Sequence, residues 1–164
     1  MSDPPKHDLE PPPRFLPSSL ELYRQEVPLI ILSKELEQRL RLLIELGKWA
    51  EEQFEDAPPD DLLTRYMLGQ MVNAGLCASH LLVHSHLRQV INIAWSFGDA
   101  SLPLLDRIQE GNLRLMRAAR EFPTIFTFRF STYARPRIRK AIEGAIDREL
   151  RQAGYTQRQS SNRK

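Results

Sequence analysis

Residues 104–116 read LLDRIQEGNLRLM, and this stretch decides the fold class of the chain. Its apolar residues recur at helical spacing, and polar residues occupy the positions between them. Pro103 suits the first turn of a helix here, and the Phe122-Pro123 pair is expected to end it. The apolar stripe comprises Leu105, Ile108, Leu115 and Ala119, with Met116 beside it.

The same helical pattern recurs before and after this stretch. Ser33 is the expected cap of a helix that runs to about Phe54, and Asp60 is the expected cap of the next. Gly75 is expected to weaken or end that second helix. A third apolar stripe runs over residues 87–94, and a last helix is predicted from the mid-130s to about residue 152. No useful length of sequence alternates with period two, so an all-α helical bundle is predicted.

Proline content divides the chain into a leader, a domain and a tail. Residues 1–17 hold six prolines and are expected to form a disordered leader, because proline lacks the backbone N–H that a helix needs. Residues 18–152 are predicted to form the helical domain. Residues 153–164 are polar and are predicted to be a disordered basic tail.

Charge is unevenly distributed, although the net charge is only +2. Residues 1–60 carry 7 Lys and Arg against 13 Asp and Glu, whereas residues 135–164 carry 9 against 3. A basic end of this kind favours contact with a polyanion, with a solvated basic tail as the alternative interpretation.

Several classes of protein fit the sequence poorly. No apolar run approaches the roughly 20 residues that span a bilayer, and no secretory signal is evident, so a cytoplasmic protein without a membrane partner is expected. The sequence has no glycine-rich phosphate loop and no nucleophile motif, so neither enzymatic activity nor a cofactor is predicted. Cys77, His80 and His84 have a spacing that can bind zinc, but without an evident fourth ligand a half-buried helix surface is the favoured reading.

Four segments together carry a family resemblance. Residues 104–116 are followed by FRFSTYA at 128–134 and IRKAI at 138–142, and LELYRQEV stands upstream at 20–27. This order closely resembles the central part of the primary, sigma-70-type bacterial sigma factors, over most of residues 18–150. The resemblance implies a bundle like sigma region 2, in a short form that lacks the family's later domains.

The resemblance implies a contact with RNA polymerase core, because the matching family helix docks on the clamp helices of the β′ subunit. Asp106, Gln109 and Glu110 form a polar patch at spacings of three and four residues, which would complement a basic partner. An ordinary solvated helix face is the alternative. The implied polymerase-binding residues are Leu105, Asp106, Gln109, Glu110, Asn112 and Met116.

The resemblance also implies promoter DNA as a partner, since family aromatics stack on unpaired bases of the minus-ten element. For the aromatic residues, core packing is the alternative, and it is the favoured reading for Phe130. The basic residues would grip phosphates without reading sequence. The implied DNA-binding residues are Phe122, Phe128, Phe130, Thr132, Tyr133, Arg135, Arg137, Arg139 and Lys140.

The sequence departs from the family pattern just after the FRFSTYA segment. Pro136 and Arg137 stand where the family has a tryptophan pair, and Lys140 replaces a glutamine. The proline predicts that the helix is broken or kinked here, or that it restarts with Pro136 in its first turn. Residues 123–127 replace a charged, glycine-containing segment of the family. Minus-ten recognition is therefore expected to be weakened or altered.

The leading hypothesis is a sigma-like transcription factor that binds polymerase core and acts at initiation. A sigma-derived regulator that occupies the sigma site and inhibits or modulates initiation is the first alternative. A helical adaptor for another protein and a plain nucleic-acid-binding module based on residues 135–164 are the others. A separate protein that supplies the missing sigma domains, or an anti-sigma regulator, is a further possible partner.

Overall fold

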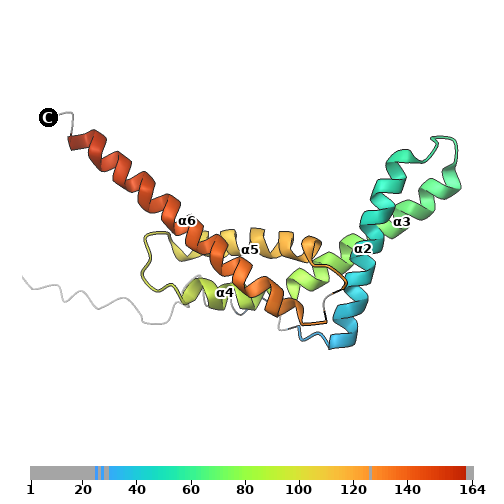
Figure 1. The fold of residues 1–164 in the computed structure, drawn as a ribbon, viewed down its shortest axis with the longest axis horizontal. Helices are drawn as coiled ribbons and strands as arrows, with labels where there is room; N and C mark the ends of the chain where they lie inside the picture. The colour runs from blue at the N-terminus through green and yellow to red at the C-terminus, as the bar shows by residue number, and fades with distance from the viewer. Residues whose placement is uncertain (1–24, 26, 28–29, 126, 162–164) are drawn as a thin grey trace, which may run out of the picture.

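The computed structural model describes residues 25, 27, 30–125 and 127–161, with side chains as far as residue 154. Within these residues every regular element is a helix, which confirms the predicted all-α class. The elements are α2 (Lys34–Asp56), α3 (Leu62–His84), α4 (Leu87–Trp95), α5 (Leu104–Glu121) and α6 (Phe130–Ser161). In Figure 1, α4, α5 and α6 pack together as a body, and α2 and α3 form a hairpin that projects from it.

Side-chain caps fix the starts of the two hairpin helices. The Ser33 hydroxyl accepts a hydrogen bond from the Leu36 N–H at 3.1 Å, which confirms Ser33 as the cap of α2. The cap of α3 is Asp61 rather than the predicted Asp60, because the Asp61 carboxylate accepts the Thr64 N–H at 3.1 Å. Hydrogen bonds from Thr64 also lower the pKa of Asp61 below its ordinary value.

A single hydrophobic core joins the base of the hairpin to the body. Apolar side chains of α3, α4, α5 and α6 interdigitate there and are removed from water, which is the main stabilising term for a bundle of this size. The largest fully buried side chains are Phe130, Leu82, Leu115, Ile138, Ile142 and Val90.

Two close helix contacts depend on glycine. A Cβ added at Gly75 would lie 2.8 Å from the Cα of Gly47, so α2 and α3 can cross there only because neither residue has a side chain. The sequence predicted that Gly75 would weaken or end α3. Instead, Gly75 lies inside α3, at the point where this helix crosses α2. In α5, a Cβ at Gly111 would lie 2.5 Å from Cγ1 of Val90, so this glycine allows α5 to approach α4.

Helix α6 corrects two predictions about the C-terminal part. Pro136 lies inside α6 without breaking it, and the helix starts at Phe130 rather than at the proline. Ala134 and Ile138, on either side of Pro136, are both fully buried, so core packing holds the two sides in one helix. The helix also continues to Ser161, nine residues beyond the predicted end at residue 152. The predicted leader at residues 1–17 lies outside the described residues.

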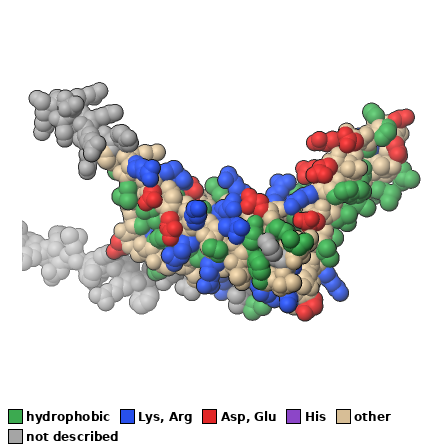
Figure 2. All heavy atoms as spheres, viewed as in Figure 1, with side chains coloured by type: hydrophobic (Ala, Val, Ile, Leu, Met, Phe, Trp, Pro, Cys, Tyr) green, Lys and Arg blue, Asp and Glu red, His purple; other side chains and the backbone are tan. Residues whose placement is uncertain are grey.

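The hairpin and the body carry different charges on their surfaces. Figure 2 shows carboxylates concentrated on the projecting hairpin, whereas Lys and Arg side chains cover much of the body on the same face. This distribution separates the carboxylates of the outer part of the hairpin from the basic residues of α6.

Candidate functional site

Helix α5 presents one face to solvent. Leu105 and Met116 are 50% and 47% exposed, and Gln109 between them is exposed as well. Ile108 and Leu115, on the opposite face, are buried in the core as the sequence predicted. Leu105 was predicted to share this buried stripe, but its side chain is exposed and does not belong to the core. The predicted polymerase-binding surface is therefore a true surface of the fold.

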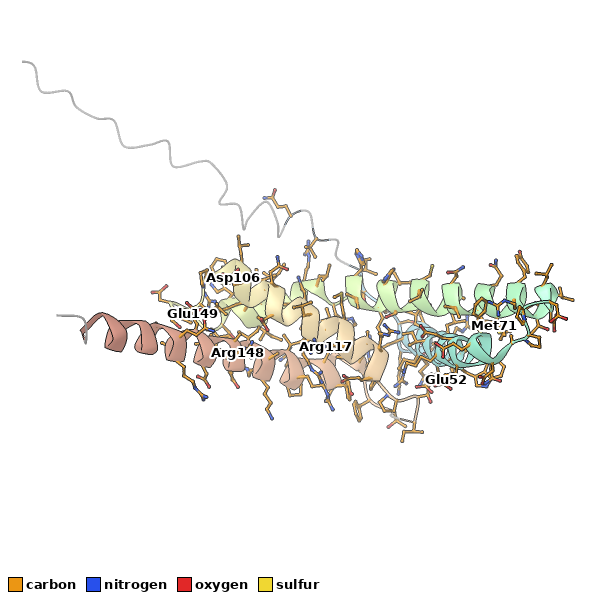
Figure 3. All side chains as sticks on the ribbon, turned by 90° about the horizontal axis from the view of Figure 1, so that it is seen from above. Glu52, Met71, Asp106, Arg117, Arg148 and Glu149 are labelled. Atoms are coloured by element: carbon orange, nitrogen blue, oxygen red, sulfur yellow. The ribbon has the colours of Figure 1, made fainter. Side chains whose placement is uncertain are left out.

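A cross-helix ion pair modifies this surface. The Arg148 guanidinium on α6 lies 3.3 Å from the Glu110 carboxylate on α5, and both side chains remain partly exposed. Figure 3 shows Arg148, Asp106 and Glu149 in the same part of the molecule, where α5 meets α6. A shallow groove of about 280 Å³ runs between the two helices. Arg148 therefore neutralises part of the acidic charge on this face of α5. Spacing within α5 could not predict this ion pair, because Arg148 is 38 residues from Glu110 and lies on another helix.

Two neighbouring residues complete the α5 face. Asn112 is half-buried, and Leu113 beside it is 48% exposed. Leu113 was missed at the level of sequence, although it stands four residues after Gln109 and a helical wheel places the two close together. The face therefore combines Leu105, Leu113 and Met116 with amide and carboxylate groups, a composition that suits a protein partner.

The aromatic residues near the start of α6 form a packed cluster. Phe122 is 2% exposed and Phe130 is fully buried, and their ring centroids lie 5.4 Å apart. Phe130 also meets the His86 ring edge-on at 4.9 Å. Phe122 and Phe130 are therefore core residues of the fold, as the packing alternative for Phe130 predicted, and their contact with DNA stays a prediction. Phe128 is 42% exposed and is accessible at the edge of the cluster.

Tyr133 is covered by a neighbour on its own helix. Its side chain is 8% exposed, and the Arg137 guanidinium lies 3.5 Å from the centre of its ring. Arg137 also donates a hydrogen bond of 3.0 Å to the Tyr133 carbonyl. The phenol donates to the Glu121 carbonyl at 3.4 Å. The ring face predicted to contact DNA is thus occupied by an arginine from within the chain.

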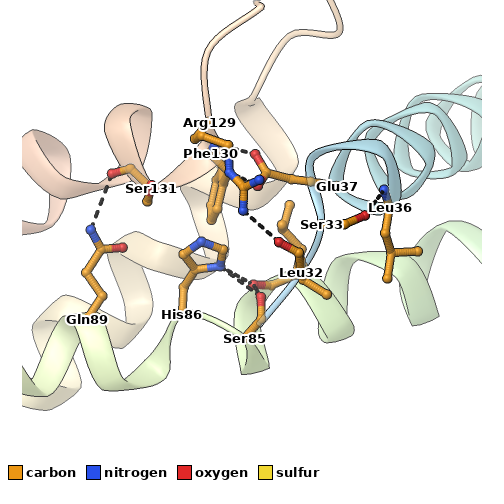
Figure 4. Close-up of polar contacts among 11 residues, drawn as sticks. Leu32, Ser33, Leu36, Glu37, Ser85, His86, Gln89, Arg129, Phe130 and Ser131 are labelled. Carbon is orange, nitrogen blue, oxygen red and sulfur yellow. Dashed lines mark hydrogen bonds and ion pairs between the residues drawn. The ribbon is translucent and has the colours of Figure 1, made fainter. Parts of the chain in front are cut away.

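A buried carboxylate of α2 fixes the start of α6 (Figure 4). Glu37 is 2% exposed, and its carboxylate accepts the backbone N–H of Phe130, the first residue of α6. The Arg129 guanidinium lies 3.0 Å from the same carboxylate and donates to the Leu32 carbonyl at 2.7 Å. Local sequence patterns could not predict this pairing, because Glu37 and Phe130 are 93 residues apart.

Two of the predicted basic residues, Arg135 and Arg139, line a groove between α4 and α6. Thr132, Arg135, Arg139 and Lys140 are exposed, and Arg137 is half-buried. Arg139 forms a 3.8 Å ion pair with Glu143, within α6. The groove has a volume of about 450 Å³. It is lined by His86, Gln89, Asn92, Ile93, Ser96, Ser131, Arg135 and Arg139.

Helix α4 supplies groove residues that were not predicted. The Gln89 side-chain amide donates to the Ser131 carbonyl at 3.3 Å, which ties α4 to the start of α6 (Figure 4). Burial lowers the pKa of His86 below its ordinary value, while hydrogen bonding to the Leu82 backbone and the Glu37 carboxylate act in the opposite direction.

The described helices hold neither a metal-binding cluster nor a membrane-spanning segment. In the part of the chain that the structure describes, no group of three or more His, Cys, Asp and Glu side chains is arranged to hold a metal ion. Cys77, His80 and His84 are exposed side chains of α3. Over the same residues, no helix combines the length and the apolar composition that a membrane crossing requires.

Comparison with known proteins gives a consistent result. Residues 82–152 match the family described as Sigma-70 region 2. The RNA polymerase principal sigma factor HrdC of Streptomyces coelicolor is 41% identical over 120 residues, which is 71% of this chain and 35% of that protein. The principal sigma factor HrdD of Streptomyces viridifaciens is 39% identical over 131 residues, which is 76% of this chain and 38% of that protein. The chain thus spans little more than a third of the length of these relatives.

Proposed function

Residues 82–152 form a sigma-70 region 2 domain within a chain that is homologous to principal sigma factors, and from this premise we propose that the protein binds bacterial RNA polymerase core and acts at transcription initiation. The observation that carries the proposal is the exposed face of α5. Leu105, Gln109 and Met116 point away from the fold, so a partner can reach them without unfolding the bundle. No catalytic step is part of this role.

The contact with the polymerase would combine apolar burial and charge. Leu105, Leu113 and Met116 supply exposed apolar surface, which contributes most of the affinity when it is removed from water. Asp106 and the partly neutralised Glu110 would orient a basic partner, such as the clamp helices of β′. Asn112 would contribute from the half-buried edge of the same face.

We further infer that promoter DNA is gripped mainly through phosphates. Arg135, Arg139 and Lys140 are exposed along one stretch of α6, and cations there attract DNA of any sequence. Base stacking has fewer candidates, because Phe130 is in the core and the Tyr133 ring lies under Arg137. Phe128 and Thr132 remain accessible. This arrangement supports weakened or altered minus-ten recognition.

A sigma-derived regulator is the second candidate function. It would occupy the sigma site on the polymerase and restrain initiation instead of opening promoters. The covered Tyr133 ring and the Pro136-Arg137 pair favour it, since both reduce the aromatic surface available to unpaired bases. Additional chains, such as one that supplies further sigma domains or an anti-sigma regulator, are compatible with either candidate.

Binding to purified polymerase core tests the shared premise. Replacing Asp106, Gln109 and Glu110 with alanine should weaken binding about tenfold or more in biolayer interferometry, because the orienting groups are lost. Glu143→Ala combined with Asp147→Ala is the matched control, since it removes two exposed carboxylates from α6 instead. Equal affinity of the two variants would contradict the α5 assignment.

Run-off transcription separates the two candidate functions. Promoter-dependent RNA from core plus this protein alone would support the initiation factor and exclude a pure inhibitor. The regulator instead predicts no such transcript, together with a dose-dependent loss of transcription when the protein competes with a principal sigma factor for core. Loss of competition in the α5 variant would link the effect to the same face.

A further inference from the structure

The outer end of the hairpin carries apolar side chains that the fold does not use. We call residues 45–76 the arm, and we call Leu62, Leu63, Tyr66 and Met67 the tip patch. These four side chains occupy the first two turns of α3 and are 74%, 71%, 66% and 52% exposed. Single exposed apolar residues are common on protein surfaces, but a contiguous cluster of this kind typically marks an interaction site.

The tip patch is not part of the contact between α2 and α3. That contact runs along the other side of α3, through Leu68 and Gly75, which are buried against α2. The Arg65 guanidinium lies 4.2 Å from the Phe54 ring centre and donates to the Ala57 carbonyl at 3.0 Å, which closes the tip of the hairpin. The patch is therefore a surface on a preformed support, and removing its side chains would not open the core.

A hollow continues the patch along α3. Leu62, Tyr66, Gly69 and Asn73 follow one another at helical spacing, so they share one stripe. At Gly69 an added Cβ would meet nothing within 4 Å, which leaves open space in that stripe. The hollow has a volume of about 280 Å³, enough for a large apolar side chain. Its lining consists of Glu51, Phe54, Glu55, Gly69, Val72 and Asn73.

Charge indicates what kind of occupant fits. The arm contains seven Asp and Glu against two Lys and Arg, whereas residues 77–154 contain seven against twelve. Both arm cations are engaged within the chain: Arg65 in the tip, and Lys48 at 3.9 Å from Glu45. Figure 2 shows the carboxylates beside the hydrophobic side chains of the hairpin, and Figure 3 labels Glu52 among them. Anionic membranes and nucleic acids would be repelled by such a surface.

We propose that the tip patch and the hollow at Gly69 bind a cationic amphipathic helix of a partner protein. One apolar side chain of that helix fills the hollow, and its neighbours cover Leu62, Leu63, Tyr66 and Met67. Lys or Arg residues at the flanks of the helix lie next to Glu55 and Glu51, the two carboxylates that line the hollow. Glu51 also pairs with Arg120 of α5 at 3.6 Å, so a partner cation there would share this carboxylate with Arg120. This is the helix-in-groove mode of recognition, with charge selecting the partner. The proposal does not depend on polymerase binding through α5.

The test uses a fluorescein-labelled model helix of about 18 residues, long enough to fold on binding, with leucine on one face and lysine on the other. Fluorescence anisotropy should detect binding of this Leu/Lys probe to the full chain, and binding should weaken as salt is raised. Gly69→Leu places a side chain in the hollow, at a position where the added Cβ meets nothing within 4 Å. It should weaken binding about tenfold or more, roughly the effect of losing one buried anchor residue.

Matched controls keep the outcome clear. Gly144→Leu adds the same side chain on α6, where an added Cβ meets only the Arg148 guanidinium at 3.8 Å, and should leave binding unchanged. A combined Leu63→Ser and Met67→Ser variant should weaken binding as Gly69→Leu does. Equal binding of a Leu/Glu probe, or an unchanged affinity after Gly69→Leu, would overturn the proposal. Co-sedimentation with phosphatidylglycerol vesicles that depends on Leu63 and Met67 would overturn it in favour of a membrane surface.

Discussion

The exposed face of α5 and the first two turns of α6 were both singled out by the same family resemblance, yet the fold treats them in opposite ways. On α5, the side chains of Leu105, Gln109 and Met116 face solvent and do not pack in the core. On α6, Phe130 is part of the core and the Tyr133 ring is covered by Arg137. A residue that matches the family pattern can thus lie on an exposed face of one helix and in the core at the start of the next.

The largest expected difference in stability is between alanine variants of the two phenylalanines that flank Arg129. Phe130→Ala should lower the free energy of unfolding by about 3–5 kcal/mol, because it leaves a cavity in the core. Phe128→Ala should cost less than about 1.5 kcal/mol, since that side chain is 42% exposed and loses little buried area. Urea denaturation followed by circular dichroism measures both values.

Affinity for DNA gives the complementary readout. Phe128→Ala should reduce binding of a single-stranded oligonucleotide, whereas Phe130→Ala should affect binding only to the extent that it unfolds the protein. Similar losses of stability in the two variants would contradict the distinction between core and surface aromatics.

The sequence could predict the helices because apolar spacing and caps are local signals. Ser33 was identified as a cap, and Ile108 and Leu115 as core residues, from spacing alone. The predicted break of the helix at Pro136 is wrong. The free-energy cost of a proline inside a helix is outweighed by the burial of Ala134 and Ile138 on either side of it, which is a tertiary effect. The pairs Glu37 with Phe130 and Glu110 with Arg148 were not predictable, since each joins residues that only the fold brings together.

Glu37 offers the next largest test, because it fixes the start of α6 and does not touch the α5 face. Glu37→Gln removes a buried charge that accepts the Phe130 N–H and pairs with Arg129, so the free energy of unfolding should fall by about 1–3 kcal/mol. Glu35→Gln is the control, because Glu35 is exposed in the first turn of the same helix. Binding to polymerase core at a temperature where the variant is folded should remain unchanged. A loss of stability no greater than that of the control would argue against the cap.

For His86, which packs against Phe130 of α6, we expect a smaller and pH-dependent effect on the free energy of unfolding. Its pKa in the folded protein lies below the ordinary value of 6.5, so between the two values the unfolded chain binds more protons. The resulting stability is present in full above about pH 6.5 and is lost as the pH falls toward the folded pKa. Denaturation of the parent and of His86→Gln at several pH values isolates this slope, with His84→Gln, at an exposed position, as control. The slope should disappear only in the His86 variant; its persistence there would assign it to other groups.

The smallest expected change in stability is for Arg137→Ala. This variant tests most directly why the Tyr133 ring is covered, whereas the α5 face is exposed. Arg137→Ala removes a guanidinium 3.5 Å from the Tyr133 ring centre, so stability should fall by only about 0.5–1 kcal/mol. The same change should uncover the ring, and nitration by tetranitromethane, mapped by mass spectrometry, should become faster at Tyr133. Tyr66 is the internal reference, since it is 66% exposed in the arm and far from the substitution. If nitration at Tyr133 stays slow, Phe122 and the rest of the cluster cover the ring by themselves, and the two helices differ in packing rather than in one arginine.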